Sequence, residues 1–76
     1  MSHHVLDVQG MLCPMPVIRL GELARRAPAG DTIELLATDP GVKADIPAWC
    51  RVHGHRVVWQ REQDEVYSFL VELQAD

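Results

Sequence analysis

The hydrophobic pattern of this chain switches between two periods, and that switching restricts the possible folds more than any other feature. Four short segments predict strands, with apolar side chains at alternate positions where the pattern is clearest: residues 5–8, 32–38, 55–61 and 66–73. Residues 13–27 and 46–53 instead place apolar side chains three and four positions apart, which is typical of helices that pack through one face. The predicted order of elements is therefore βαβαββ.

The last two predicted strands are separated by a turn at residues 63–64 and should form a hairpin. Two helices can cover one face of a four-stranded sheet and leave the other face open. The expected fold class is α/β, a two-layer sandwich with both helices on one face. The side chains expected on the open face are Leu36, Leu70 and one of Val58 or Trp59.

The boundaries of the helices depend on Pro, Gly and Asp residues. For the second helix, Asp39 is a candidate cap for a turn that begins at Pro40, and Asp45 is the other candidate cap. Pro47 belongs in a first turn rather than in a helix interior, so the start of this helix is ambiguous. Gly21 lies near the apolar face of the first helix, where close packing on the sheet would explain it.

Chain length limits the protein to one domain. A chain of 76 residues can bury only about 60% of its unfolded surface, enough for a thin two-layer core. We expect a single domain over residues 1–76, with residues 1–4 disordered.

Charge and cysteine count narrow the functional classes. The net charge of -4, from 7 Lys and Arg against 11 Asp and Glu, opposes general binding to nucleic acid or to an anionic membrane. No signal peptide and no apolar stretch long enough to span a membrane are apparent. Two cysteines do not make a disulfide framework, so we expect a cytoplasmic protein with reduced thiols.

The segment Cys13-Pro14-Met15-Pro16 lies between a predicted strand and a predicted helix. A residue before proline is driven out of the helical conformation, so Cys13 is predicted to be the N-cap and Pro14 the first helical residue. There the helix dipole would favour thiolate, the nucleophilic form of cysteine. Met15 N–H is the nearest donor expected for the sulfur, and the prolines should hold the loop rigidly.

The cysteines also allow simpler interpretations. Cys13 could be a small buried hydrophobic residue, and Cys50, on the apolar face of the second helix, fits a structural role better. Cys50 and His53 have the spacing of half a metal site. No second cysteine–histidine pair has ligand spacing, so we predict no metal. His53 and His55 are expected to be surface residues on either side of Gly54, which should end the helix.

Residues 7–16, Asp-Val-Gln-Gly-Met-Leu-Cys-Pro-Met-Pro, resemble the signature of the TusA (SirA-like) sulfur-carrier family. Residues 28–31, 38–41 and 45–55 resemble the same family in order and spacing. The resemblance runs from about Leu6 to the C-terminus, which is nearly the whole chain.

The resemblance implies a four-stranded mixed sheet and a persulfide on Cys13 as the covalent intermediate, with no separate cofactor. A donor protein, such as a cysteine desulfurase or a rhodanese, would pass sulfane sulfur to Cys13. The chain would then hand the sulfur to an acceptor sulfurtransferase or sulfur-relay protein, in tRNA thiolation, cofactor assembly or sulfur oxidation. It would be a persulfide carrier rather than a stand-alone enzyme. The residues expected to support Cys13 are Asp7, Gly10, Pro14, Met15 and Pro16.

The first predicted helix also carries Arg19, Arg25 and Arg26, a candidate partner-binding surface whose alternative role is a solvated helix face. A non-catalytic interaction or regulatory module on the same fold is the alternative function, with Leu36 and Leu70 on a partner surface. Nucleic-acid binding is disfavoured by the net charge and by the lack of an aromatic stacking array.

Overall fold

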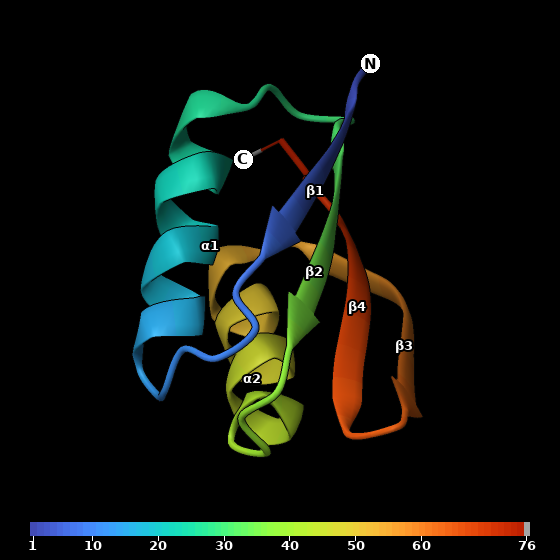
Figure 1. Ribbon diagram of the computed structural model, residues 1–76. Coiled ribbons are helices and arrows are strands. Elements are labelled where there is room, and N and C mark those ends of the chain that lie inside the picture. The colour runs from blue at the N-terminus through green and yellow to red at the C-terminus, as the bar shows by residue number, and fades with distance from the viewer. Residues whose placement is uncertain (76) are drawn as a thin grey trace.

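The computed structural model describes residues 1–75 and has the predicted order of elements. The elements are β1 (His3–Asp7), α1 (Met15–Arg26), β2 (Thr32–Ala37), α2 (Val42–His53), β3 (Arg56–Gln63) and β4 (Val66–Glu72). Both helices cover the same face of the sheet (Figure 1), which confirms the predicted two-layer α/β sandwich.

The four strands form one mixed sheet in the order β1-β2-β4-β3. β1 pairs with β2 in parallel, whereas β4 pairs with β2 and with β3 in antiparallel orientation. Parallel neighbours run in the same direction, so the chain leaves β1 and β2 at the same edge of the sheet. This topology places the β1–α1 connection beside the β2–α2 connection.

The hydrophobic core lies between the sheet and the helices. Positions along β2 and β4 alternate between buried and half-buried, as expected for strands with one covered face. The buried apolar side chains are Val8, Leu20, Ile33, Leu35, Ala37, Val42, Ile46, Cys50, Tyr67, Phe69, Val71 and Leu73.

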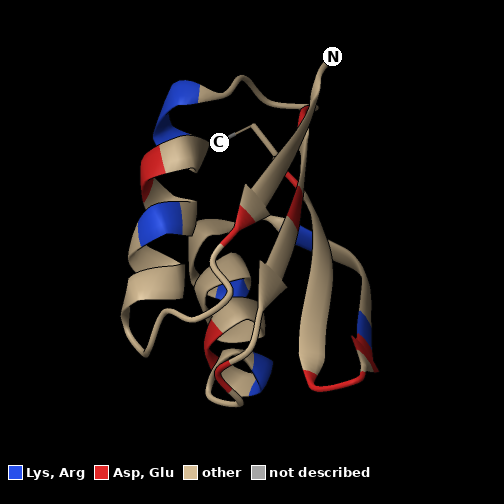
Figure 2. Cartoon of the chain, viewed as in Figure 1, with Lys and Arg blue, Asp and Glu red and all other residues tan. Residues whose placement is uncertain are grey.

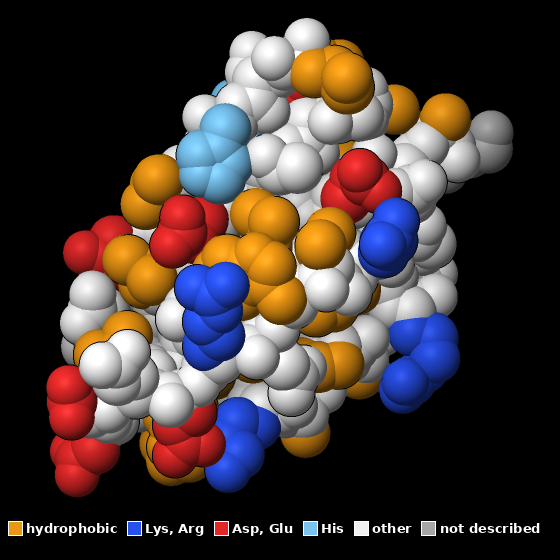
Figure 3. Space-filling view, turned by 90° about the vertical axis from the view of Figure 1, so that its right-hand side faces the viewer, with side chains coloured by type: hydrophobic (Ala, Val, Ile, Leu, Met, Phe, Trp, Pro, Cys, Tyr) orange, Lys and Arg blue, Asp and Glu red, His pale blue; other side chains and the backbone are white. Residues whose placement is uncertain are grey.

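The other face of the sheet has no helix over it, and Figure 3 views the molecule from this side, with apolar side chains among charged ones. Leu36 and Leu70 alternate with buried residues and therefore face this side, as predicted. A β-bulge determines which of Val58 and Trp59 joins them on the open face. Val57 packs against the core, and the register then shifts so that Trp59 pairs with Leu70. Trp59 rather than Val58 thus continues the open face.

The N-terminal residues differ from the expectation that residues 1–4 are disordered. His3 and His4 belong to β1 and pair with β2. Asp31, which is almost fully buried, explains this order. Its carboxylate accepts a hydrogen bond from Ser2 N–H at 2.9 Å and contacts His4 Nε2 at 2.8 Å. Sequence periodicity missed this contact because the residues that make it are polar.

α2 begins between the starts that the two candidate caps predicted, after Pro40 and before the residue that follows Asp45. Gly41 is its N-cap, so Asp45 lies within the first turn and caps nothing. Pro47 lies in the helix interior, contrary to the prediction, although its ring removes one backbone hydrogen bond there. Gly54 ends the helix in the left-handed conformation (φ 75°), as predicted. Within residues 1–75, neither helix has the length and apolar character needed to cross a bilayer.

Candidate functional site

Cys13 lies at the end of the loop between β1 and α1, where its side chain is exposed. The N-cap of α1 is Pro14, not Cys13, and no side chain caps this helix. Ile18 N–H donates to Pro14 O at 3.1 Å, which is the first hydrogen bond expected of a helix capped at Pro14. The predicted capping role of Cys13 is therefore wrong by one position.

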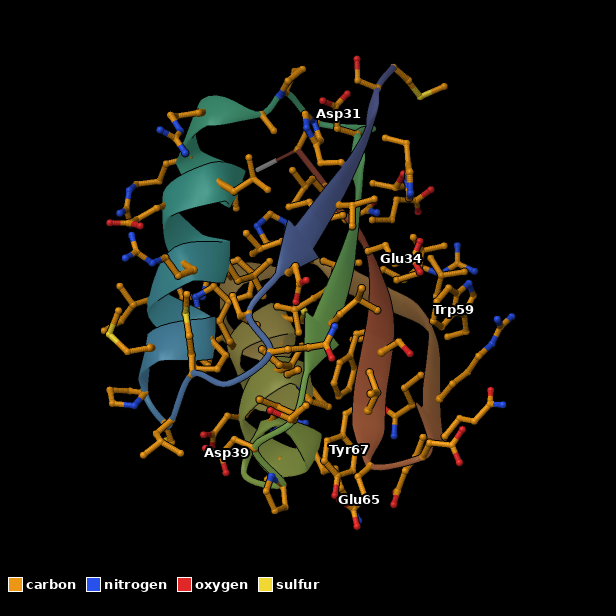
Figure 4. All side chains as sticks on the ribbon, in the orientation of Figure 1. Asp31, Glu34, Asp39, Trp59, Glu65 and Tyr67 are labelled. Carbon is orange, nitrogen blue, oxygen red and sulfur yellow. The ribbon has the colours of Figure 1, made fainter. Side chains whose placement is uncertain are left out.

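Two carboxylates from distant parts of the chain contact Cys13. Its backbone N–H donates to Asp39 Oδ2 at 2.7 Å, and its Sγ–H donates to Asp45 Oδ2 at 3.1 Å. Asp39 comes from the connection after β2, and Asp45 comes from the first turn of α2. Figure 4 shows Asp39 at the end of the molecule where β1 and β2 finish. The parallel pairing of these strands brings the residues together.

The carboxylates reverse the electrostatic prediction for Cys13. The hydrogen bond to Asp45 raises the pKa of the thiol above its ordinary value, with smaller contributions from desolvation and from the charges of Asp45 and Asp39. Cys13 precedes the N-cap of α1, so it does not hold the position from which the helix was expected to favour the thiolate. Met15 N–H, the expected donor to the sulfur, donates to Leu12 O at 2.9 Å instead. The hydrogen bond to Asp45 therefore favours the thiol over the thiolate.

The residues predicted to support Cys13 shape its loop rather than contact its sulfur. Asp7 Oδ1 accepts the Gln9 N–H at 3.0 Å, an Asx turn at the end of β1. Gly10 has a φ of 83°, a conformation that favours glycine, and its N–H donates to Thr38 Oγ1 at 2.9 Å. This bond ties the loop to the segment that carries Asp39.

The two prolines and Met15 anchor the other end of the loop. Pro14 caps α1 and Pro16 lies in its first turn, where a missing N–H breaks no helical hydrogen bond. Pro16 is buried, Met15 is half-buried and Pro14 is exposed. These contacts fix the backbone on both sides of Cys13 while leaving its side chain accessible.

The three arginines of α1 are exposed, and Figure 2 marks their positions along the helix in blue. Arg19 pairs with Glu22 at 3.1 Å, and Arg25 and Arg26 lie in the last turn. Together these four residues line an open groove of about 450 Å³. Cys13 lies just before the start of the same helix, so a protein bound along α1 would reach the thiol.

Gly21 packs against α2 rather than against the sheet. A Cβ on Gly21 would lie 3.8 Å from Trp49 Nε1 and 3.8 Å from Arg25 Nη1. Trp49 also stacks on His53, with ring centroids 4.5 Å apart. These rings and His55 line a hollow of about 210 Å³ between the helices. The i, i+4 spacing of Trp49 and His53 was the available sequence signal for this stack.

Cys50 has a different environment from Cys13. It is buried on the core side of α2, and burial raises the pKa of its thiol to about 11. His53, its possible partner in a metal site, contacts the Trp49 carbonyl through Nδ1 at 3.0 Å. Residues 1–75 contain no group of three His, Cys, Asp or Glu side chains arranged to hold a metal ion. Of the two thiols, that of Cys13 is exposed and that of Cys50 is buried.

Asp39 and Asp45 are the site residues that sequence reasoning missed. Both were interpreted only as helix caps. The signal that could have found them is topological. If β1 and β2 are parallel neighbours, an acidic residue just after β2 lies at the same edge as the cysteine after β1.

The fold and the site define a class of protein: a small two-layer α/β domain that presents one exposed thiol beside the start of a helix. The chain belongs to the TusA family. The model of that family, described as "Sulfurtransferase TusA", matches residues 4–73. The family resemblance predicted from the sequence is confirmed.

Curated relatives are similar over nearly their whole length. A putative sulfur carrier protein of Neisseria meningitidis, NMA0882, is 38% identical over 72 residues, 95% of this chain and 97% of the relative. The sulfur carrier protein TusA of Pseudomonas putida is 36% identical over 95% of this chain and 90% of its own. A putative sulfur carrier of Bacillus subtilis, YrkI, is 34% identical over 93% of this chain and 95% of its own.

Proposed function

We propose that this protein is a sulfur carrier that holds sulfane sulfur as a persulfide on Cys13. Family membership and the names of the relatives support this role. The observation that carries the assignment to Cys13 is accessibility: Cys13 is exposed and Cys50 is buried. A thiol that exchanges sulfur with other proteins must be reachable, because both reacting sulfurs have to meet in line.

Loading and delivery follow the chemistry of thiol–disulfide exchange. The Cys13 sulfur attacks the outer sulfur of the donor persulfide, a new S–S bond forms, and the donor's own S–S bond breaks. The electron pair of that bond leaves with the donor thiolate, which takes up the proton lost by Cys13. In delivery, an acceptor thiolate attacks the outer sulfur on Cys13, and Cys13 leaves. No net oxidation occurs in either step.

The partners we propose are a donor such as a cysteine desulfurase or rhodanese and an acceptor sulfurtransferase or sulfur-relay protein. The acceptor would act in tRNA thiolation, cofactor assembly or sulfur oxidation. The groove lined by Arg19, Arg25 and Arg26 supports docking along α1, because it lies on the helix that starts just after Cys13 and carries positive charge. Reversing the charge at Arg25 should slow loading by a protein donor but not reaction with a small disulfide.

The test is loading by a protein donor. The chain is incubated with a cysteine desulfurase and cysteine, and its intact mass is measured before and after reduction. The expected result is a reducible gain of one sulfur atom in the natural chain and in Cys50→Ser, and no gain in Cys13→Ser. Loading of Cys13→Ser, or no loading with several sulfur donors, would overturn the proposal.

The open face of the sheet supports a second candidate, a non-catalytic interaction module. Val5 on this face is 62% exposed, and Leu36, Trp59 and Leu70 continue the apolar surface. Retained cellular function in Cys13→Ser would favour this candidate over the carrier.

A further inference from the structure

The hydrogen bond between Cys13 and Asp45 determines which form of the sulfur the free protein presents. The thiol is the donor in this 3.1 Å contact, since an ionised carboxylate can only accept. If Cys13 lost its proton, the hydrogen bond would be replaced by repulsion between two negative charges. The contact therefore holds the sulfur in its less nucleophilic form and orients it toward α2.

Asp39 adds to this effect from the loop before α2. Its two carboxylate oxygens accept the N–H groups of Cys13 and Gly41, at 2.7 and 3.2 Å. The carboxylates of Asp39 and Asp45 both approach Gly41, whose Cβ would lie 3.6 Å from Asp39 Oδ2 and 3.7 Å from Asp45 Oδ2. Two negative charges thus lie together beside the sulfur.

Within residues 1–75, neither the Asp39 nor the Asp45 carboxylate forms a salt bridge. The charged groups that act on Cys13 are these two carboxylates, one from α2 and one from the loop before it. A positive charge brought by another molecule could therefore pair with either carboxylate.

We propose that Asp45 keeps Cys13 protonated in the free protein, so that Cys13 reacts fastest with sulfur donors that carry a positive charge beside the attacked sulfur. The biological meaning of this selectivity rests on the proposed sulfur-carrier function, but the selectivity itself belongs to the isolated chain. A cation that approaches Asp45 offsets its negative charge and favours the thiolate. An anionic donor is repelled and leaves the thiol protonated.

The proposed step is balanced with any disulfide or persulfide donor. As the cation pairs with Asp45, the Cys13 proton passes to the solvent and the sulfur attacks the donor. One S–S bond forms and the donor S–S bond breaks, with its electron pair on the departing thiolate. That thiolate takes a proton from the solvent, so no oxidant or reductant is consumed. The ion pair with Asp45 ends when the cationic product leaves.

Three small symmetrical disulfides of different charge test this selectivity without a partner protein. Cystamine is a dication, 2-hydroxyethyl disulfide is neutral and 3,3′-dithiodipropionate is a dianion. The rate at which each modifies Cys13 is measured by mass in the natural chain, Asp45→Asn and Asp45→Ala. Glu34→Gln is the control, because it removes one negative charge from the open face of the sheet.

In the natural chain, and in Glu34→Gln, cystamine should react faster than the dianion. Removing Asp45 should reduce the preference for cystamine over the neutral disulfide roughly fivefold, the effect of one unit charge about 4 Å away in water. Both Asp45 variants should also reach half-maximal rate with the neutral disulfide at a lower pH than the natural chain. A preference unchanged by both substitutions, or a pH profile that does not move, would overturn the role of Asp45.

This result is independent of the donor-loading test. Unchanged selectivity together with desulfurase loading of Cys13 would overturn the role of Asp45 alone. Clear selectivity with no loading by any donor would overturn the sulfur-carrier function alone.

Discussion

Cys13 Sγ lies 3.1 Å from Asp45 Oδ2, although the two residues are 32 positions apart in the chain. The contact joins the loop after β1 to the first turn of α2, across the edge where the parallel strands β1 and β2 end. It makes the reactivity of the thiol a property of the folded domain and not of the Cys-Pro-x-Pro segment alone.

The pH dependence of Cys13 alkylation should reveal this contact. In the folded chain the pKa of Cys13 is raised, so the thiolate fraction at neutral pH is smaller than in an unstructured peptide of residues 7–16. The rate of alkylation by iodoacetamide should therefore rise at higher pH in the folded chain than in the peptide. Equal profiles, or an earlier rise in the folded chain, would contradict the assignment.

The same contact predicts the direction of a stability change. Because the pKa is higher in the folded state, the thiol–carboxylate interaction contributes fully below the pKa of the unfolded thiol. This contribution disappears as the pH rises through the pKa of the folded thiol. In Asp45→Asn, the free energy of unfolding measured by urea titration should therefore fall less at alkaline pH than in the natural chain.

Cys50 should be inert in the native protein. Its burial in the core blocks access, and a pKa of about 11 leaves almost no thiolate at neutral pH. A thiol count with a maleimide should give one reactive cysteine in buffer and two in concentrated urea. Native labelling of Cys50 at a rate close to that of Cys13 would be inconsistent with this packing.

Asp31 should make the fold sensitive to acid. Its hydrogen bonds to His4 and to the Ser2 N–H lower its pKa, so its contribution to stability is present above the unfolded pKa of about 3.9. The contribution is lost as the pH falls through the lower pKa of the folded state. Asp31→Ala should lower Tm at pH 7 by several degrees, and the difference from the natural chain should shrink in acid.

Glu62→Gln, on an exposed position of β3, is the matched control for Asp31→Ala and should leave Tm almost unchanged. If Asp31→Ala has the same Tm as the natural chain at pH 7, the contacts of Asp31 with the N-terminal residues contribute nothing to stability.

Gly21→Ala should stabilise the protein. The added Cβ would make ordinary contacts with Trp49 and Arg25 at 3.8 Å, and alanine loses less conformational freedom in a helix than glycine. The expected gain in the free energy of unfolding is about 0.5–1 kcal/mol, measured by urea denaturation. Gly54→Ala should instead destabilise, because Gly54 has a left-handed φ of 75°. A loss of stability in Gly21→Ala would mean that the two helices cannot accept even a methyl group.

The fold was predictable because the residues that face the core follow the periodicity of apolar side chains in the sequence. Ile33 and Phe69, for example, alternate with partly exposed neighbours along β2 and β4. Errors and open alternatives fell where polar contacts or backbone irregularities determine the structure. The strand at His3, which was not expected, depends on Asp31, and the bulge between Val57 and Trp59 selected Trp59 over Val58 for the open face.

Half of the site was predictable from the sequence. Cys13 stood out because two prolines surround it at a strand–helix junction. Its chemical state was not predictable, because the group that controls it is a tertiary neighbour. The position of Cys13 next to a helix predicted that the helix dipole would favour the thiolate. In the structure, the carboxylate of Asp45 favours the thiol instead.

The most direct measurement of sulfur carriage is to map the transferred sulfur. After loading by a desulfurase, persulfides are capped by alkylation and the protein is cleaved with trypsin. Cleavage after Arg19, Lys43 and Arg51 separates Cys13, in residues 1–19, from Cys50, in residues 44–51. The proposed function predicts one additional sulfur atom on the peptide of residues 1–19 and none on the peptide of residues 44–51. Sulfur on the Cys50 peptide, or on neither peptide, would contradict it.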